Sequence, residues 1–325
     1  MSDQLWQYAA SELAKMIRKK EVSSEEVVQD HLQRIEEVNP KLNSITIVLE
    51  ESSLAEARKA DKSEPIGPLH GVPVTVKENI DLFGTPTTSG IPAGAKLMPT
   101  ADAPVVKRLK DAGAIPIGRT NLPELGLRID TDNPLRGRTL NPWDQTRTAG
   151  GSSGGEASAI ASGMSPLGLG NDIGGSVRNP AFCCGISSLK PSAGRIPRAS
   201  TIAPVERGFA DQWMAVDGPM ARRVEDLRVA YEVLSGREIL DPMTVDVPLY
   251  GPDFPNRAAI VKEVPGVELP QSALGAIDKV ESVLRSAGWE TQEVQPPELE
   301  RVHEIWAHVL SANFKPLVDD PELFP

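Results

Sequence analysis

Cysteine is almost absent from this sequence. Its 325 residues include two cysteines, Cys183 and Cys184, and they are adjacent. Neighbouring cysteines rarely bridge one another, and one pair cannot make a disulfide framework, so the sequence predicts a reducing compartment. Adjacent thiols also lack the spacing of metal ligands. We therefore expect both cysteines to be buried, inert packing residues.

Long hydrophobic runs and aromatic residues are also scarce. No apolar stretch approaches the ~18 residues of a membrane span, and residues 1–10 lack the basic and apolar regions of a signal peptide. Aromatic residues make up 4% of the chain, too few for a platform that stacks single-stranded nucleic acid. The formal net charge of −11 disfavours phosphate backbones and anionic lipid. We predict a cytoplasmic protein that binds neither nucleic acid nor membrane.

The order of the expected elements predicts an α/β fold. Hydrophobic residues make up 40% and charged residues 24%, as in ordinary globular proteins. The capping box Ser23–Glu26 predicts a helix that ends near Asn39–Pro40. Beyond residue 65 short apolar runs alternate with helical patterns, which favours a mixed sheet covered by helices. The expected strands are 45–49, 72–76, 114–118, 257–261 and 290–294, the expected helices are 54–60, 101–112, 156–162, 222–235 and 272–286, and residues 191–219 are expected to form loops.

Three familiar motifs are matched only in part. A Walker loop at residues 150–155 would need a lysine where the sequence has Glu156. A nucleophile elbow with Ser153 as nucleophile would need a preceding strand, but residues 141–148 read as a loop. His303 and His308 are one residue too far apart for a zincin helix, so we expect an ordinary surface helix there.

A serine hydrolase with a lysine base fits the same residues better. Glycine-rich turns at 150–155 and 174–176 would let backbone N–H groups approach a reacting oxygen. A serine hydroxyl needs a neighbouring base, and Lys77 ends a predicted strand. The alternative is that the glycines form turns, the serines cap helices and Lys77 is a solvated strand end. On these motifs alone both interpretations stay open.

Two longer stretches closely resemble the amidase signature family. They are residues 67–81 (GPLHGVPVTVKENID) and residues 150–191, which begin GGSSGGEASAIASG. The resemblance runs through most of residues 60–240 and implies one large α/β domain, with a mixed β-sheet covered on both faces by α-helices. Residues 1–64 would be an N-terminal helical segment packed on the core, 65–240 the signature core with the catalytic triad, and 241–325 a C-terminal α/β part of the same domain. Relatives continue further, so we expect this last part to be incomplete.

The resemblance also implies a Ser–cis-Ser–Lys triad. Lys77 matches the lysine of the family's V-K-[ED]-N motif, Ser152 the bridging serine and Ser176 the nucleophile of D-I-G-G-S. It implies a cis peptide bond between Gly151 and Ser152. Lys77 would have to be neutral to accept a proton, which requires burial that lowers its pKa.

Further roles follow from the same resemblance. The oxyanion hole would consist of backbone N–H groups, those of Ile173, Gly174, Gly175 and Ser176. Asp172 and Arg178 would form a salt bridge that braces the nucleophile turn, and Ser153 would be a hydrogen-bonding neighbour. Asn171 stands where the family leads us to expect threonine.

The function implied is hydrolysis of a carboxylic acid amide to acid and ammonia or amine, through a serine acyl-enzyme. The substrate would be a small-molecule amide, with the acyl pocket lined by residues 125–138 and 199–213. No cofactor or metal is implied, and a homodimer is a possible assembly. Two alternatives are a glutaminase subunit of a tRNA-dependent amidotransferase and a truncated, non-catalytic family member.

Overall fold

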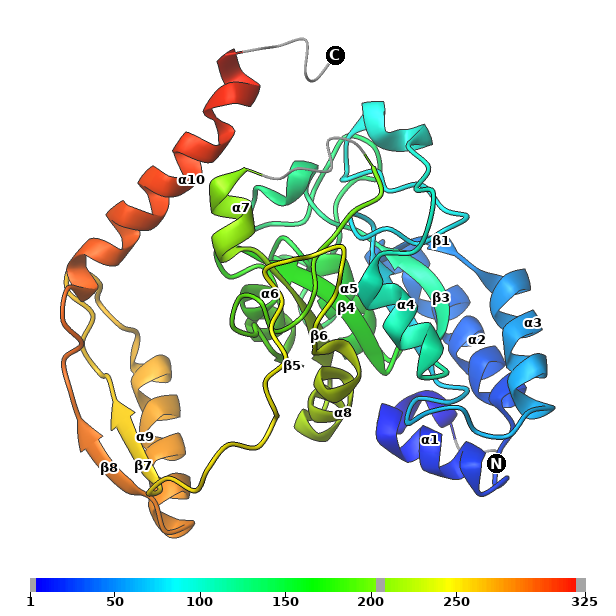
Figure 1. The fold of residues 1–325 in the computed structure, drawn as a ribbon, viewed down its shortest axis with the longest axis horizontal. Coiled ribbons are helices and arrows are strands. Elements are labelled where there is room, and N and C mark those ends of the chain that lie inside the picture. The colour runs from blue at the N-terminus through cyan, green and yellow to red at the C-terminus, as the bar shows by residue number, and fades with distance from the viewer. Residues whose placement is uncertain (1–3, 203–207, 320–325) are drawn as a thin grey trace. The chain divides into compact units, whose positions relative to one another are not determined.

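The computed structural model describes residues 4–202 and 208–319 (Figure 1). Its contacts divide the chain at Val247–Pro248 into two compact units. The division falls within the proline- and aspartate-rich stretch 240–255. The larger unit contains every residue of the predicted site. The assignment of residues 1–64, 65–240 and 241–325 to parts of a single domain stays a prediction.

The larger unit combines helices with a six-stranded sheet. Its helices are η1 (Leu5–Gln7), α1 (Ala10–Arg18), α2 (Ser24–Leu42), α3 (Glu50–Asp61), η2 (Pro92–Lys96), α4 (Pro104–Asp111), η3 (Glu124–Gly126), α5 (Gly154–Ala161), α6 (Arg178–Cys184), α7 (Phe209–Met214) and α8 (Val224–Leu234). Its strands are β1 (Ile45–Val48), β2 (Pro73–Lys77), β3 (Ile115–Thr120), β4 (Leu167–Asp172), β5 (Ser187–Ser188) and β6 (Val216–Ala221).

The strand order of this sheet is β1-β3-β2-β4-β6-β5. β2 lies in the middle and is parallel to both β3 and β4, whereas β1, β5 and β6 pair antiparallel with their neighbours. Figure 1 shows the sheet between helices from different parts of the chain. The predicted fold class, a mixed α/β structure, is confirmed.

The two faces of the central strands differ in chemistry because side chains alternate along a strand. Val74 and Val76 of β2, with Leu167 and Leu169 of β4, belong to an apolar core that includes α1, α4 and α8. Thr75 and the other residues of opposite parity face α5. The central strands thus pack on an apolar layer on one face and meet α5 on the other, where a second apolar cluster joins α2, α3, α5 and β3.

Glycines on β4 let α5 approach that second face. A Cβ at Gly168 would lie 1.8 Å from Glu156 Oε1, and one at Gly170 would lie 2.7 Å from Ser153 Oγ. Both distances are too short for a side chain, so the sequence needs glycine at these two positions. The start of α5 is thereby placed directly against the middle of the sheet.

The first long helix begins as predicted and ends slightly later. Ser23 Oγ accepts a hydrogen bond from Glu26 N at 3.1 Å, and Glu26 Oε2 accepts one from Ser23 N at 2.8 Å, so the capping box is confirmed. The predicted end near Asn39–Pro40 is wrong by two residues, because α2 continues to Leu42. Pro40 lies in the last turn, where its missing N–H removes a single helical hydrogen bond.

The prediction of loops throughout residues 191–219 is wrong. This stretch contains α7 and most of β6, which pairs antiparallel with β4 along its whole length. Gly218 and Pro219 read locally as a turn. The structure uses Gly218 because a Cβ there would lie 2.2 Å from Leu189 O. Long-range pairing with β4 therefore overrides the local signal.

The smaller unit contains β7 (Arg257–Ile260), α9 (Gln271–Ser286), β8 (Glu290–Glu293), η4 (Leu299–Arg301) and α10 (Val302–Asp319). β7 and β8 are parallel, and the predicted strands and the helix between them are confirmed. Among the residues that the structure describes, no helix is both long and apolar enough to cross a membrane.

Candidate active site

Lys77 is the last residue of β2, and none of its side chain is exposed. The parity of the strand places it, like Thr75, on the face opposite Val74 and Val76. A fully buried lysine contradicts the alternative in which this residue is a solvated strand end. Burial of an amine is costly unless its hydrogen bonds are satisfied, so its partners matter.

Two oxygen atoms lie within hydrogen-bond distance of the Lys77 amine. Nζ donates to Ser152 Oγ at 2.7 Å and to Asn171 Oδ1 at 2.7 Å. Ser152 comes from the glycine-rich loop before α5, and Asn171 from the end of β4. The structure therefore brings Lys77 and the predicted bridging serine into direct contact.

The electrostatics favour a neutral amine at this position. Burial lowers the pKa of Lys77 from 10.5 to about 7, because removal from water disfavours the ammonium. Asp217, Asp172 and Glu156 act in the opposite direction, while Arg198 adds to the lowering. A lysine with such a pKa exchanges a proton readily near neutral pH, as a general base must.

The loop that holds Ser152 is tightly constrained. The Gly151–Ser152 peptide bond is cis, as the resemblance implies, and Gly150 has a φ of +80°. A Cβ at Gly151 would lie 2.5 Å from Arg128 O, which explains the glycine there. Thr131 Oγ1 donates to Gly150 O at 2.8 Å and accepts from Gly154 N at 3.1 Å. Ser152 thus lies in a loop that residues 128–131 hold in place.

Ser176 lies in the turn that follows β4, and Asp172 organises this turn. Its carboxylate accepts from Gly175 N at 2.8 Å and Val177 N at 3.0 Å. Arg178 adds two side-chain hydrogen bonds to it, at 2.9 and 3.0 Å, so the expected ion pair is present. Burial alone would raise the pKa of Asp172, but Arg178 and the two N–H groups hold it below its usual value.

The two glycine-rich turns lie against each other. Ser153 N donates to Ser176 O at 3.1 Å, and Gly151 N donates to Asn179 Oδ1 at 3.0 Å. Ser153 is completely buried, and its Oγ donates to Asn171 O at 3.4 Å. Ser176 is partly exposed, whereas Lys77 is not. The arrangement places a buried lysine beside the Ser152 hydroxyl, with a second serine nearer the surface.

Glu156 is a residue of this site that the sequence reasoning missed. It lies in the first turn of α5, is completely buried and accepts hydrogen bonds from Thr75 Oγ1 and Thr120 Oγ1. Burial raises the pKa of Glu156 to about 7, although these two hydrogen bonds and Lys77 lower it. The available signal was a charged residue within a helix of otherwise small residues.

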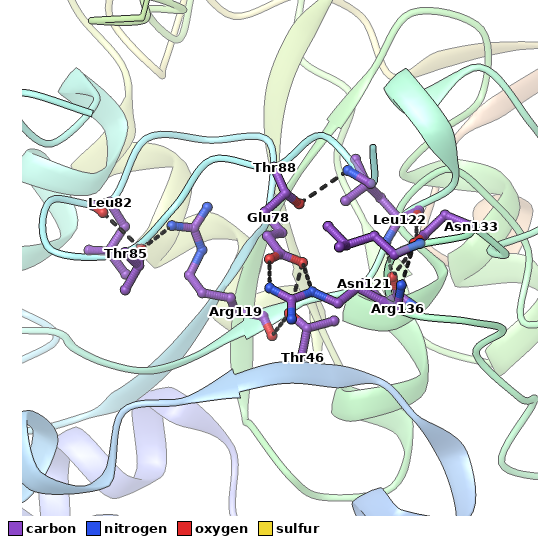
Figure 2. Close-up of polar contacts among 12 residues, drawn as sticks. Thr46, Glu78, Leu82, Thr85, Thr88, Arg119, Asn121, Leu122, Asn133 and Arg136 are labelled. Atoms are coloured by element: carbon purple, nitrogen blue, oxygen red, sulfur yellow. Dashed lines mark hydrogen bonds and ion pairs between the residues drawn. The ribbon is translucent and has the colours of Figure 1, made fainter. Parts of the chain in front are cut away.

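A polar network fixes the backbone around the end of β2 (Figure 2). Arg119 of β3 is completely buried, and its Nη2 donates to Lys77 O at 3.1 Å and to Ile80 O at 2.6 Å. Glu78, the residue after Lys77, forms an ion pair with Arg136 and accepts from Thr46 Oγ1 at 2.9 Å. These contacts hold the segment that carries the lysine.

The two cysteines are the last two residues of α6. Cys184 is buried and burial raises its pKa to about 12, as expected of an inert thiol. Cys183 is only partly buried, so the prediction that both are buried is wrong for this residue, which lies near the end of α6. Within residues 4–202 and 208–319, no three His, Cys, Asp or Glu side chains are grouped as metal ligands.

A mixed sheet with a buried lysine, a serine after a cis peptide bond and a second serine in a glycine-rich turn defines the amidase-signature class of proteins. The model of the amidase family matches residues 26–320. This chain therefore belongs to the amidase family.

Individual relatives agree with this assignment. The chain is 42% identical over 313 residues to indoleacetamide hydrolase of Bradyrhizobium diazoefficiens, covering 94% of this chain and 60% of that relative. It is 36% identical over 303 residues to a glutamyl-tRNA(Gln) amidotransferase subunit of Trichodesmium erythraeum, covering 88% and 61%. Among solved structures, the native peptide amidase of Stenotrophomonas maltophilia superposes with a TM-score of 0.83 at 28% identity, covering 94% and 66%. The chain spans about three-fifths of the length of these curated relatives.

Proposed function

We propose that this chain hydrolyses a carboxylic acid amide through a serine acyl-enzyme, with Ser176 as nucleophile, Ser152 as proton relay and Lys77 as base. One observation carries the proposal: a completely buried lysine with a pKa of about 7 lies 2.7 Å from Ser152 Oγ. At neutral pH about half of such lysines are neutral and able to accept a proton.

The reaction would proceed by two passes of a proton along the same relay. Ser176 Oγ attacks the amide carbonyl carbon, its proton moves to Ser152 Oγ, and the proton of Ser152 moves to Lys77 Nζ. The C–N bond then breaks and the leaving nitrogen takes a proton back through Ser152. Water attacks the resulting ester, the relay accepts and returns its proton, and the acid leaves with Ser176 restored.

The negative charge on the carbonyl oxygen would be held by N–H groups of the nucleophile turn. Of the four proposed, the Gly175 N–H already donates to Asp172 at 2.8 Å. To take part, the Gly175 N–H would have to share its hydrogen bond between Asp172 and the carbonyl oxygen. Asp172 and Arg178 would act by holding the turn in shape rather than by touching substrate.

The acyl group would be recognised by the loop 125–138, part of which lies beside Ser152. Leu127 and Ile129 in this loop are 48% and 74% exposed, and Gly126 approaches the Ser152 hydroxyl, where a Cβ would lie 3.3 Å away. The second predicted pocket segment, 199–213, is described only in part, since 203–207 lie outside the described residues. Similarity to an indoleacetamide hydrolase favours a primary amide of an arylacetic acid as substrate.

A second candidate function is that of a glutaminase subunit, which similarity to glutamyl-tRNA(Gln) amidotransferase subunits favours. The two candidate functions differ in the acyl group of the substrate and in their dependence on a partner subunit. Indole-3-acetamide and glutamine should therefore be compared as substrates, with and without amidotransferase partner subunits. Glutaminase activity that appears only with the partners would replace the first assignment. Sedimentation of the same preparation tests the proposed homodimer.

Labelling with a fluorophosphonate probe tests the nucleophile. The wild-type chain is expected to be labelled and Ser176→Ala to lose the label, since the probe reacts with an activated serine hydroxyl. Ser63→Ala, at an exposed position, is the matched control and should label normally. Persistent labelling of Ser176→Ala would refute the assignment. A wild-type chain that neither labels nor turns over amides would instead identify a non-catalytic family member.

A further inference from the structure

The side chain of Asn171 occupies a position between the Lys77 amine and a second asparagine. Asn171 Oδ1 accepts from Lys77 Nζ at 2.7 Å, and Asn171 Nδ2 donates to Asn79 Oδ1 at 2.9 Å. Asn171 is 8% exposed, so water competes little for these bonds. The second contact also defines which end of the amide faces the lysine, since only the NH₂ group can donate to Asn79 Oδ1.

We propose that Asn171 is a positioning residue, which holds Lys77 Nζ beside Ser152 Oγ through its side-chain carbonyl oxygen and is itself oriented by Asn79. This inference rests on the proposed function. It assigns a role to the residue that stands where the family leads us to expect threonine.

The chemistry of an amide oxygen suits this role. A neutral amine has two N–H donors and one lone pair, and the lone pair must face the Ser152 hydroxyl to take its proton. If one N–H is bound to Asn171 Oδ1, the amine has fewer orientations left, and one of them presents the lone pair to Ser152. The amide oxygen can accept a hydrogen bond from either an ammonium or an amine, so it can hold Nζ before and after proton transfer.

Asn171 also supplies this contact without adding a charge. The charged groups that act on Lys77 are Asp217, Asp172, Glu156 and Arg198. Asp217 of β6 lies directly opposite Asn171 in the antiparallel register of β4 and β6. A carboxylate at position 171 would join these acids and favour the ammonium, whereas the amide binds the amine and leaves the proton free to move.

Three variants separate positioning from a merely structural role. Asn171→Asp keeps the shape and adds a charge, Asn171→Leu keeps the approximate size and removes the acceptor, and Asn171→Thr keeps a shorter acceptor. For each, the pKa of Lys77 is read from the ¹³Cε resonance of labelled lysine, assigned by its loss in Lys77→Met. The pH dependence of kcat and KM for an amide substrate is measured alongside.

Asn171→Asp is expected to raise the pKa of Lys77 and to move the ascending limb of the kcat profile upward by about 1–3 pH units. Asn171→Leu is expected to lower the plateau kcat about 10- to 100-fold with little change in KM, because the base is no longer aimed at the relay. Asn171→Thr should restore most of that loss. The matched control is Asn141→Asp, a buried amide that donates to Thr148 O and Cys183 O, which should leave the pKa of Lys77 unchanged.

An unchanged pKa of Lys77 in Asn171→Asp, or a wild-type kcat in Asn171→Leu, would overturn the proposal. If Asn171→Leu does not fold, the isosteric Asn171→Asp decides. The lysine titration needs no turnover, so it tests Asn171 even in a chain without amidase activity. Failure of this inference is thereby distinguishable from failure of the proposed function, which would show as absent labelling and turnover in the wild type.

Discussion

Replacing Lys77 by methionine is expected to change how the stability of the larger unit depends on pH. In the folded chain burial lowers the pKa of this lysine from 10.5 to about 7. Between these pH values the unfolded chain carries a proton that the folded chain has lost, so unfolding takes up a proton. The destabilising contribution of Lys77 is therefore complete below pH 7, shrinks as the pH rises and vanishes above 10.5.

The size of the effect follows from the same two values. A proton taken up on unfolding changes the free energy of unfolding by about 1.36 kcal/mol per pH unit. Between about pH 7.5 and pH 9.5 the wild type should gain about 2 to 3 kcal/mol that Lys77→Met does not gain. Taking the difference between two pH values cancels the loss of the hydrogen bonds to Ser152 and Asn171, which is the same at both.

Urea unfolding followed by tryptophan fluorescence measures this difference. Trp289 and Trp306 belong to the smaller unit and should first be replaced by phenylalanine in both proteins. The remaining tryptophans, Trp6, Trp143 and Trp213, then report on the larger unit alone. Unfolding is recorded at both pH values for each protein.

The control is Lys107→Met, which removes a lysine that is 68% exposed. It should keep the pH dependence of the wild type, because an exposed amine loses little hydration on folding. If Lys77→Met and the wild type gained the same stability between the two pH values, the lysine would not be buried as an amine. The assignment of Lys77 as the base would then lose its physical support.

Three further predictions concern residues other than Lys77. Because the folded chain favours the protonated carboxyl of Glu156, the wild type should lose about 3 kcal/mol of stability as the pH rises from 4.5 to about 7. Glu156→Gln should not show this loss, and urea unfolding across that pH range measures it. Gly168→Ala should destabilise the chain by about 1–3 kcal/mol through its clash with α5, whereas Gly275→Ala, within α9 with open space around it, should raise helix stability by up to ~1 kcal/mol; thermal unfolding compares them. Arg178→Met should lower kcat about 10- to 100-fold with little change in KM, because Asp172 loses the partner that braces the turn; a normal kcat would contradict this.

The parts of the fold that could be predicted are those with strong local patterns. The apolar runs at 45–49 and 114–118 became β1 and β3, and the capping box at Ser23 became the start of α2. The turns that hold Ser152 and Ser176 could be predicted from the glycine-rich segments 150–155 and 174–176. In each case the residues that determine the structure are close together in the sequence.

What could not be predicted depends on contacts between distant segments. β6 looks like a turn at Gly218, and its pairing with β4 depends on residues about fifty positions away. The carboxyl of Glu156 is understood only when Thr75 and Thr120 are placed beside it. Periodicity alone cannot reveal such a group, because no repeating pattern marks a single buried carboxyl.

The apolar face of the central strands offsets part of the cost of the polar groups buried on the face that meets α5. Near pH 7 the buried Lys77 alone costs about 4 kcal/mol relative to an unfolded chain, a large part of a typical stability of about 5–15 kcal/mol. Val74, Val76 and Leu169 on the opposite face each contribute about 1.5–3 kcal/mol when fully buried, enough together to offset it. A variant with an apolar side chain at position 77 should therefore be more stable than the wild type at low pH and inactive at every pH. If Lys77 is a buried base, its replacement should raise stability and abolish activity. If Lys77 is instead a charged lysine with a structural role, its replacement should lower stability.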